Sequence, residues 1–137
     1  MRLVSGCLLG INCKYSGKDN RDERVMELLK VEVLIPVCPE QLGGMTTPRA
    51  PAEIAFDKVI NEEGLDLTSH FVNGALETLK IANLYGIKEA ILKDSSPSCG
   101  SKMIYDGNFS KTKIKGEGYC TRLLRKNGIN VISENDL

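Results

Sequence analysis

The sequence has 137 residues, of which 42% are hydrophobic, and it carries 18 basic and 18 acidic side chains. This length fits one domain over residues 1–137, and the balanced charge gives no global field that would attract nucleic acid or an anionic membrane. The longest apolar stretch, residues 33–37, falls far short of the roughly 20 residues that span a bilayer. We therefore expect a cytoplasmic protein that contacts no membrane, and nothing favours nucleic acid as a partner.

The chain opens with a predicted strand, helix and strand. Residues 2–5 predict a short strand, and Asp19 or Asn20 is placed to cap the helix that follows. Residues 31–37 then predict a buried strand, because they are apolar and rich in β-branched side chains.

The middle of the chain predicts a loop, a hairpin and a long helix. Two Gly and three Pro between residues 38 and 51 indicate the loop. Residues 54–56 and 65–67 predict the two strands of a small hairpin. Apolar residues at i, i+3, i+4 and i+7 then predict a helix that Ser69 caps and Gly86 ends.

The last third predicts a further strand, a long polar loop, a helix and a final strand. The strands are residues 90–92 and 129–132, the loop covers residues 100–116, and the helix ends at Gly128. Helices that alternate with buried strands predict an α/β fold: a mostly parallel, Rossmann-like sheet with helices on both faces, plus the small hairpin.

Three of the five cysteines follow predicted strands. Cys7, Cys38 and Cys99 each lie just beyond the end of one. In an open parallel sheet, ligands bind outside the carboxyl ends of the strands, so we expect these three thiols at one site. In a reducing compartment, an odd number of cysteines favours metal binding or catalysis over disulfides. Thiolates are soft ligands that suit iron–sulfur clusters, zinc or copper(I).

The other two cysteines are interpreted differently. Cys120 lies beside Leu123 and Leu124 in the last predicted helix and reads as a packing residue. Cys13 lies in the turn after Cys7, where it is a candidate fourth ligand, a reactive thiol or a turn residue; we favour the last.

Three other functions remain open on these residues alone. A zinc site is weakened because the chain has no closely spaced Cys-x-x-Cys pair. A thiol or persulfide sulfur-transfer protein would use Cys13 or Cys99 as its nucleophile. An iron–sulfur sensor would bind a cluster and turn over nothing.

Three segments together resemble the 2-thiouracil desulfurase family, and the resemblance covers nearly the whole chain. They are SGCLLG at residues 5–10, CPE at residues 38–40 with the following Gly-Gly and Pro-Arg pairs, and SPSCG at residues 96–100 with a following Ile-Tyr-Asp-Gly.

The resemblance implies a cofactor, a substrate class and a reaction. Cys7, Cys38 and Cys99 are expected to bind a [4Fe-4S] cluster in which one iron has no protein ligand. The substrate is expected to be a small thiolated base or nucleoside, such as 2-thiouracil. The enzyme would remove its sulfur as hydrosulfide without net redox change.

Such a reaction needs a base to activate water and an acid to assist departure. Glu40, two residues beyond Cys38, is the candidate base, and Ser96 and Ser98 are candidates to orient water or relay a proton. The alternatives are a solvated loop carboxylate for Glu40 and ordinary turn chemistry for the two serines.

Overall fold

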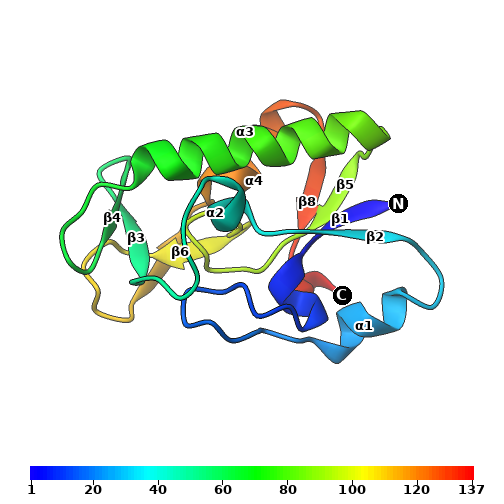
Figure 1. The fold of residues 1–137 in the computed structure, drawn as a ribbon, viewed down its shortest axis with the longest axis horizontal. Helices are drawn as coiled ribbons and strands as arrows, with labels where there is room; N and C mark the ends of the chain where they lie inside the picture. Colours follow the sequence, from blue (N-terminus) through cyan, green and yellow to red (C-terminus); the bar gives the residue numbers. More distant parts are fainter.

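A computed structural model describes all 137 residues and places a four-stranded parallel sheet at the centre of the molecule (Figure 1). Its strands are β1 (Arg2–Ser5), β2 (Leu34–Val37), β5 (Glu89–Ile91) and β8 (Asn130–Ile132), in the spatial order β2-β1-β5-β8. Every neighbouring pair is parallel. The predicted parallel α/β sheet is confirmed, and β1 lies between the two strands that carry the other site segments.

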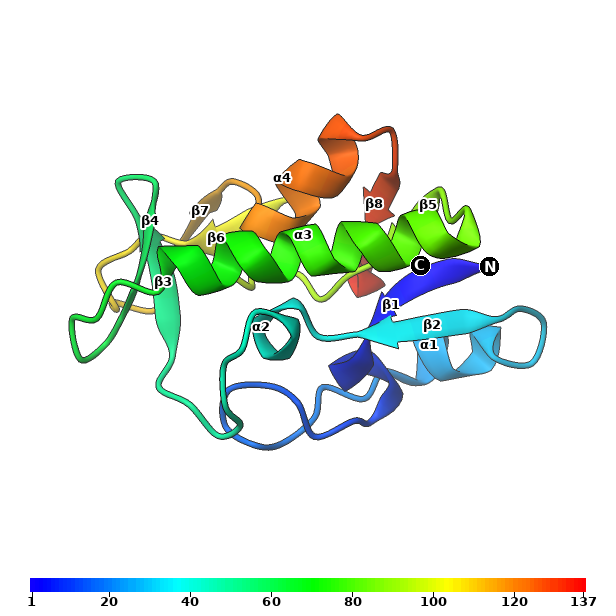
Figure 2. The same cartoon turned by 45° about the horizontal axis from the view of Figure 1, so that its top comes forward.

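Helices cover both faces of this sheet, as predicted. α3 (Thr68–Tyr85) and α4 (Tyr119–Lys126) lie on one face, and α1 (Glu23–Leu28) lies on the other (Figures 1 and 2). α3 ends where Gly86 adopts a left-handed conformation, with φ of 65°. This is the predicted end of that helix, and a residue without a Cβ adopts this conformation at little cost.

Alternate side chains of the strands supply the two cores. Leu3 and Ala90 are buried with side chains of α3 and α4, whereas Val4 and Ile91 are buried with side chains of α1. Because successive residues of a strand point to opposite faces, one short strand serves both layers. The apolar runs in the sequence reflect this burial on two sides.

Two segments predicted as loops contain regular structure. α2 (Pro39–Leu42) begins directly after Cys38, and its proline occupies a first-turn position that helices tolerate well. β6 (Met103–Tyr105) and β7 (Lys113–Lys115) form an antiparallel hairpin within residues 100–116. These elements have only three or four residues each, too short for the periodicity that identifies longer ones.

The first hairpin is not formed by the predicted strands, residues 54–56 and 65–67. It pairs β3 (Ala52–Ala55) with β4 (Lys58–Asn61), and its turn is Phe56-Asp57. Both turn residues have positive φ, 49° and 61°, as two-residue hairpin turns require. Asn and Gly usually supply that conformation, so Phe-Asp gave no signal of a turn.

Two helices begin at residues other than the predicted caps. Asp22, rather than Asp19 or Asn20, caps α1 and accepts a hydrogen bond from the Arg24 N–H. α3 begins at Thr68, one residue before Ser69. Both shifts are within the usual uncertainty of helix ends.

Glycines allow α2 to lie directly against α3. A Cβ on Gly74 would lie 1.9 Å from the Pro39 carbonyl oxygen, and a Cβ on Gly43 would lie 2.0 Å from that of His70. Only hydrogen atoms fit at these two positions, so the two helix backbones are in contact. This contact fixes α2, and with it the residues at the start of that helix.

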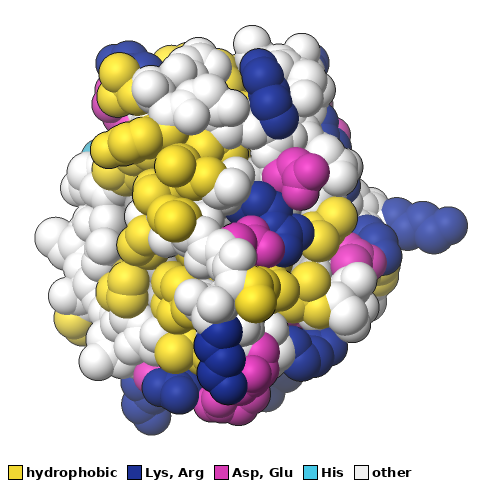
Figure 3. Space-filling model, turned by 90° about the vertical axis from the view of Figure 1, so that its right-hand side faces the viewer, with side chains coloured by type: hydrophobic (Ala, Val, Ile, Leu, Met, Phe, Trp, Pro, Cys, Tyr) yellow, Lys and Arg dark blue, Asp and Glu magenta, His cyan; other side chains and the backbone are white.

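The opposite end of the sheet, where the strands begin, carries exposed hydrophobic side chains. Figure 3 looks onto that side of the molecule, where hydrophobic side chains gather on one part of the surface and charged ones on another. Val31 and Val33 precede β2, and Leu84 and Tyr85 end α3. No helix of the structure has the length and apolar character needed to cross a membrane.

Candidate functional site

A cavity of about 580 Å³ opens at the carboxyl ends of β1, β2 and β5, and four of the five cysteines line it. Cys7 lies on a short 3-10 helix, η1 (Gly6–Leu9), directly after β1. Cys38 separates β2 from α2, and Cys99 lies in the loop after β5. The structure therefore brings Cys7, Cys38 and Cys99 to one cavity, at the edge of the sheet that their sequence positions indicate.

Cys13 also belongs to this cavity, although we expected a turn residue. It does lie in the turn after η1, but its side chain is 2% exposed and lines the cavity together with those of Cys7 and Cys38. The Cys13 thiol lowers the pKa of the Cys7 thiol, and it lowers that of Cys38 to about 6. The pKa of Cys13 itself is raised by the same contacts. Nothing in the local sequence distinguishes this thiol from a packing residue.

Cys99 and Cys120 lie in more apolar surroundings. Burial raises the pKa of the Cys99 thiol well above its ordinary value, even though the Ser98 hydroxyl oxygen lies 3.6 Å from its sulfur. Cys120 does not line the cavity and is buried in the core beside α3, where burial raises its pKa to about 12. Its position is that of a packing residue, as predicted.

The set of donors suits a sulfide-bridged iron cluster. Four thiols line the cavity, and thiolates are the ligands that hold iron–sulfur clusters. Asn20 donates a hydrogen bond of 3.4 Å to the Cys7 sulfur, and the Gln41 backbone N–H donates to that of Cys38. Such hydrogen bonds orient thiolate ligands and tune a cluster.

Three side chains named as catalytic candidates form one hydrogen-bonded chain beside the cysteines. Ser98 Oγ donates to Glu40 Oε2 over 3.1 Å, and Ser96 Oγ lies 2.9 Å from Ser98 Oγ. Ser96 Oγ also accepts hydrogen bonds from the backbone N–H groups of Ser98 and Cys99. Ser96 therefore forms the backbone hydrogen bonds of a tight turn and also contacts Ser98. Its hydroxyl proton is free to point to Ser98.

Arg49 fixes the other side of Glu40. Its Nε donates to Glu40 Oε1 over 3.1 Å, and a second nitrogen donates to the Cys13 carbonyl oxygen over 2.9 Å. The side chain is 6% exposed, so Arg49 is not a surface residue. It is a buried side chain that links the Cys13 segment to the Cys38 segment. An Arg after a Pro in a loop gave no sequence signal of this role.

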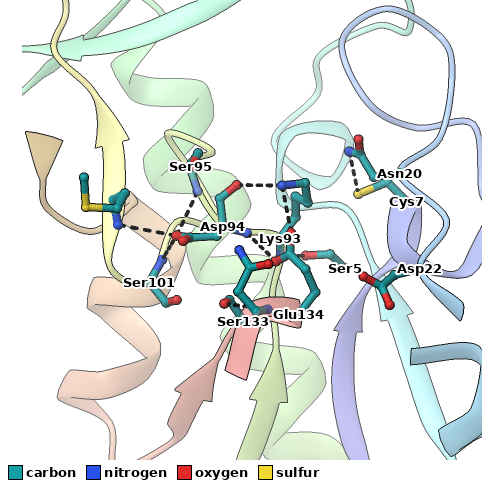
Figure 4. A network of polar contacts seen from close by, with 12 residues as sticks. Ser5, Cys7, Asn20, Asp22, Lys93, Asp94, Ser95, Ser101, Ser133 and Glu134 are labelled. Atoms are coloured by element: carbon teal, nitrogen blue, oxygen red, sulfur yellow. Dashed lines mark hydrogen bonds and ion pairs between the residues drawn. The ribbon is translucent and has the colours of Figure 1, made fainter. Parts of the chain in front are cut away.

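A second polar network holds the Cys99 loop in place (Figure 4). Lys93, two residues after β5, forms an ion pair of 2.8 Å with Glu134. Asp94 Oδ1 accepts from four backbone N–H groups of that loop, those of Ser95, Ser101, Lys102 and Met103. Sequence reasoning missed both residues because they directly follow a strand and match no motif.

Comparison with known proteins gives three matches. A family model described as 2-thiouracil desulfurase matches residues 3–136. The uncharacterized protein YbbK of Bacillus subtilis (strain 168) is 42% identical over 147 residues, which cover 100% of this chain and 97% of that protein. Among solved structures, the [4Fe-4S]-dependent thiouracil desulfidase TudS is 42% identical and matches with a TM-score of 0.94, over 99% of this chain and 91% of that one.

Proposed function

Since the chain belongs to the 2-thiouracil desulfurase family, we propose that it is an iron–sulfur enzyme that removes sulfur from a thiolated pyrimidine such as 2-thiouracil. One observation carries the proposal. Cysteines from three distant segments line one cavity, directly beside the hydrogen-bonded pair Glu40–Ser98. Neither a packing role for the cysteines nor a solvated carboxylate accounts for this arrangement.

Cys7, Cys38 and Cys99 are the proposed ligands of a [4Fe-4S] cluster. With these three ligands, one of its four irons would have no protein ligand. When bound, the cluster supplies a Lewis acid that polarises the C–S bond.

Glu40 and Ser98 handle the protons of the reaction. Water supplies the oxygen of the product carbonyl, the C–S bonds break, and sulfur leaves as hydrosulfide with a proton released. Glu40 accepts the proton of the attacking water as general base, while Arg49 holds its carboxylate in place. Ser98 relays a proton along the chain that Ser96 continues.

Aromatic side chains form part of the outer cavity wall. Tyr15, Tyr105 and Phe109 line it, and their flat faces suit a planar heterocycle such as a pyrimidine. The carbon skeleton of the substrate therefore packs on these rings while the sulfur points to the cysteines.

The test is an anaerobic assay on protein with a reconstituted cluster. We expect about four irons per chain and the conversion of 2-thiouracil to uracil, with one hydrosulfide released for each uracil formed. A loaded protein that releases no hydrosulfide from any thiolated base or nucleoside would contradict the desulfurase and favour the sensor. A protein that stays colourless and iron-free after reconstitution would contradict the cluster itself.

A further inference from the structure

Lys93 presents a positive charge to the same cavity as the cysteines. Its side chain is 30% exposed and lines the cavity. The ammonium pairs with Glu134 over 2.8 Å and donates to the Asp94 carbonyl oxygen over 3.1 Å. An ammonium carries three N–H groups, so one remains without a protein partner.

The counter-charge of Lys93 lies outside the cavity. Glu134 is not among the residues that line the cavity, and its side chain is only 7% exposed. Its second oxygen accepts a hydrogen bond of 2.9 Å from the Asp94 backbone N–H, and a capping box between Ser133 and Asp136 holds this turn of chain. Figure 4 shows Lys93 between Glu134 on one side and the Cys7–Asn20 pair on the other.

Arg49 also lines the cavity and is more deeply buried than Lys93, but its charge is differently placed. Arg49 gives its hydrogen bonds to Glu40, to Thr47 and to two backbone carbonyl oxygens. Its partner Glu40 lines the cavity as well, so this pair adds no net charge there. Lys93 is instead paired with Glu134, a carboxylate that does not line the cavity, so the Lys93 ammonium contributes its positive charge to the cavity.

We propose that Lys93 is the electrostatic partner of the anionic cluster and of the departing sulfur, and that Glu134 is its positioning residue. This inference rests on the proposed function, because the proposed function supplies the cluster and the departing sulfur as the anionic groups. A [4Fe-4S] core of charge +2 with three thiolates has a net charge of −1, and it becomes more negative on reduction. A fixed neighbouring cation therefore stabilises the reduced form and raises the reduction potential. It also stabilises the negative charge that develops on sulfur as the C–S bond breaks.

The first test is the reduction potential of the reconstituted cluster, followed by electron paramagnetic resonance. We expect a more negative potential in Lys93→Met, a more positive one in Glu134→Gln, and a value close to the wild type in the double variant. Lys93→Arg, which keeps the charge, should stay near the wild type. Lys102→Met is the matched control, because this lysine also pairs with a carboxylate, Asp136, but lies outside the cavity.

Two results would overturn the proposal. One is an unchanged potential in Lys93→Met at full iron content. The other is a shift in the same direction for Lys93→Met and Glu134→Gln, because a disturbed structure, unlike a charge, does not reverse sign. Should Glu134→Gln fold poorly, the comparison of Lys93→Met with Lys93→Arg decides the question.

Turnover provides a second, separate measurement. We expect Lys93→Met to lower kcat about 100-fold, as loss of a group that stabilises developing charge does, with KM little changed and Lys93→Arg close to the wild type. An effect confined to KM would contradict a role in sulfur departure. If the loaded wild-type protein desulfurates nothing, the proposed function fails, while the potentials still test the charge at Lys93.

Discussion

The hydroxyl group of Ser98 donates a 3.1 Å hydrogen bond to the carboxylate of Glu40, across 58 positions of sequence. Ser98 is 2% exposed and lies in the Cys99 loop, whereas Glu40 lies on α2 next to Cys38. The contact therefore joins two of the three cysteine segments through the side chains that we propose for proton transfer.

Replacing Ser98 by alanine should abolish most turnover and spare the cluster. We expect Ser98→Ala to release hydrosulfide about 100-fold more slowly, the usual scale for losing a positioned proton-transfer group, with unchanged iron content. Ser101→Ala is the matched control in the same loop, because the buried Ser101 hydroxyl has no hydrogen-bond partner. Full activity in Ser98→Ala would show that the Ser98–Glu40 contact is only structural.

The cysteines should separate into two classes by iron content. After anaerobic reconstitution, Cys7→Ser, Cys38→Ser and Cys99→Ser should each lose most of the iron and the visible absorption, because a hard oxygen is a poor substitute for a thiolate. Cys120→Ala should keep both, since this side chain lies in the core.

Cys13→Ala distinguishes two roles for the fourth cavity thiol. We expect it to keep the cluster, as three ligands suffice in the proposed site. A loss of iron equal to that in Cys38→Ser would instead make Cys13 a ligand, and the proposal of an open iron would be wrong.

Gly74→Ala should destabilise the protein although alanine is the better helix former. In a free helix this change stabilises by about 0.5–1 kcal/mol. Here the new Cβ would meet the Pro39 carbonyl oxygen at 1.9 Å, and overpacking of this kind costs about 1–3 kcal/mol. Thermal unfolding measures the effect. Asn73→Ala, an exposed neighbour on the same helix, should leave the midpoint unchanged or raise it, and an equal rise in Gly74→Ala would contradict the close contact of α2 and α3.

Asp94 should make stability depend on acid pH. Burial opposes its ionisation, but the four backbone N–H groups outweigh burial and hold the pKa of this carboxyl below its usual value. A lowered folded pKa stabilises the folded state above about pH 4, and that stability is lost as pH falls through the folded pKa.

The matching variant is Asp94→Asn. It should lower the free energy of unfolding by about 1–3 kcal/mol at pH 7, the contribution of hydrogen bonds to a charged group, and by less near pH 3. Urea unfolding of the cluster-free protein at both values measures this. A loss of stability that is the same at both pH values would contradict an ionised Asp94.

The sheet and its site edge were predictable because burial on both faces leaves continuous apolar runs, and each run leads directly into a cysteine segment. The short hairpins were not, since three- or four-residue strands have too few positions for a pattern, and the Phe56-Asp57 turn lacks Asn or Gly. Glu40 and Ser98 became candidates only through their nearness to cysteines in the sequence. Arg49 and Lys93 could not be identified from the sequence. Each pairs with a residue on another segment, Glu40 and Glu134 respectively, and no local motif indicates such a pairing.

The segment that leads to Cys99 is held to β1 by a contact between residues far apart in the sequence. The Lys93 backbone N–H bonds to the Ser5 side chain, 88 positions away in the sequence, so the third cysteine segment docks only after most of the chain has left the ribosome. Contacts of such long range form late, and metal sites of this kind bind tightly only when the surrounding chain is folded. Cluster binding by the three proposed cysteine ligands would therefore need a nearly complete chain, and we expect a chain truncated before Cys99 to bind no iron.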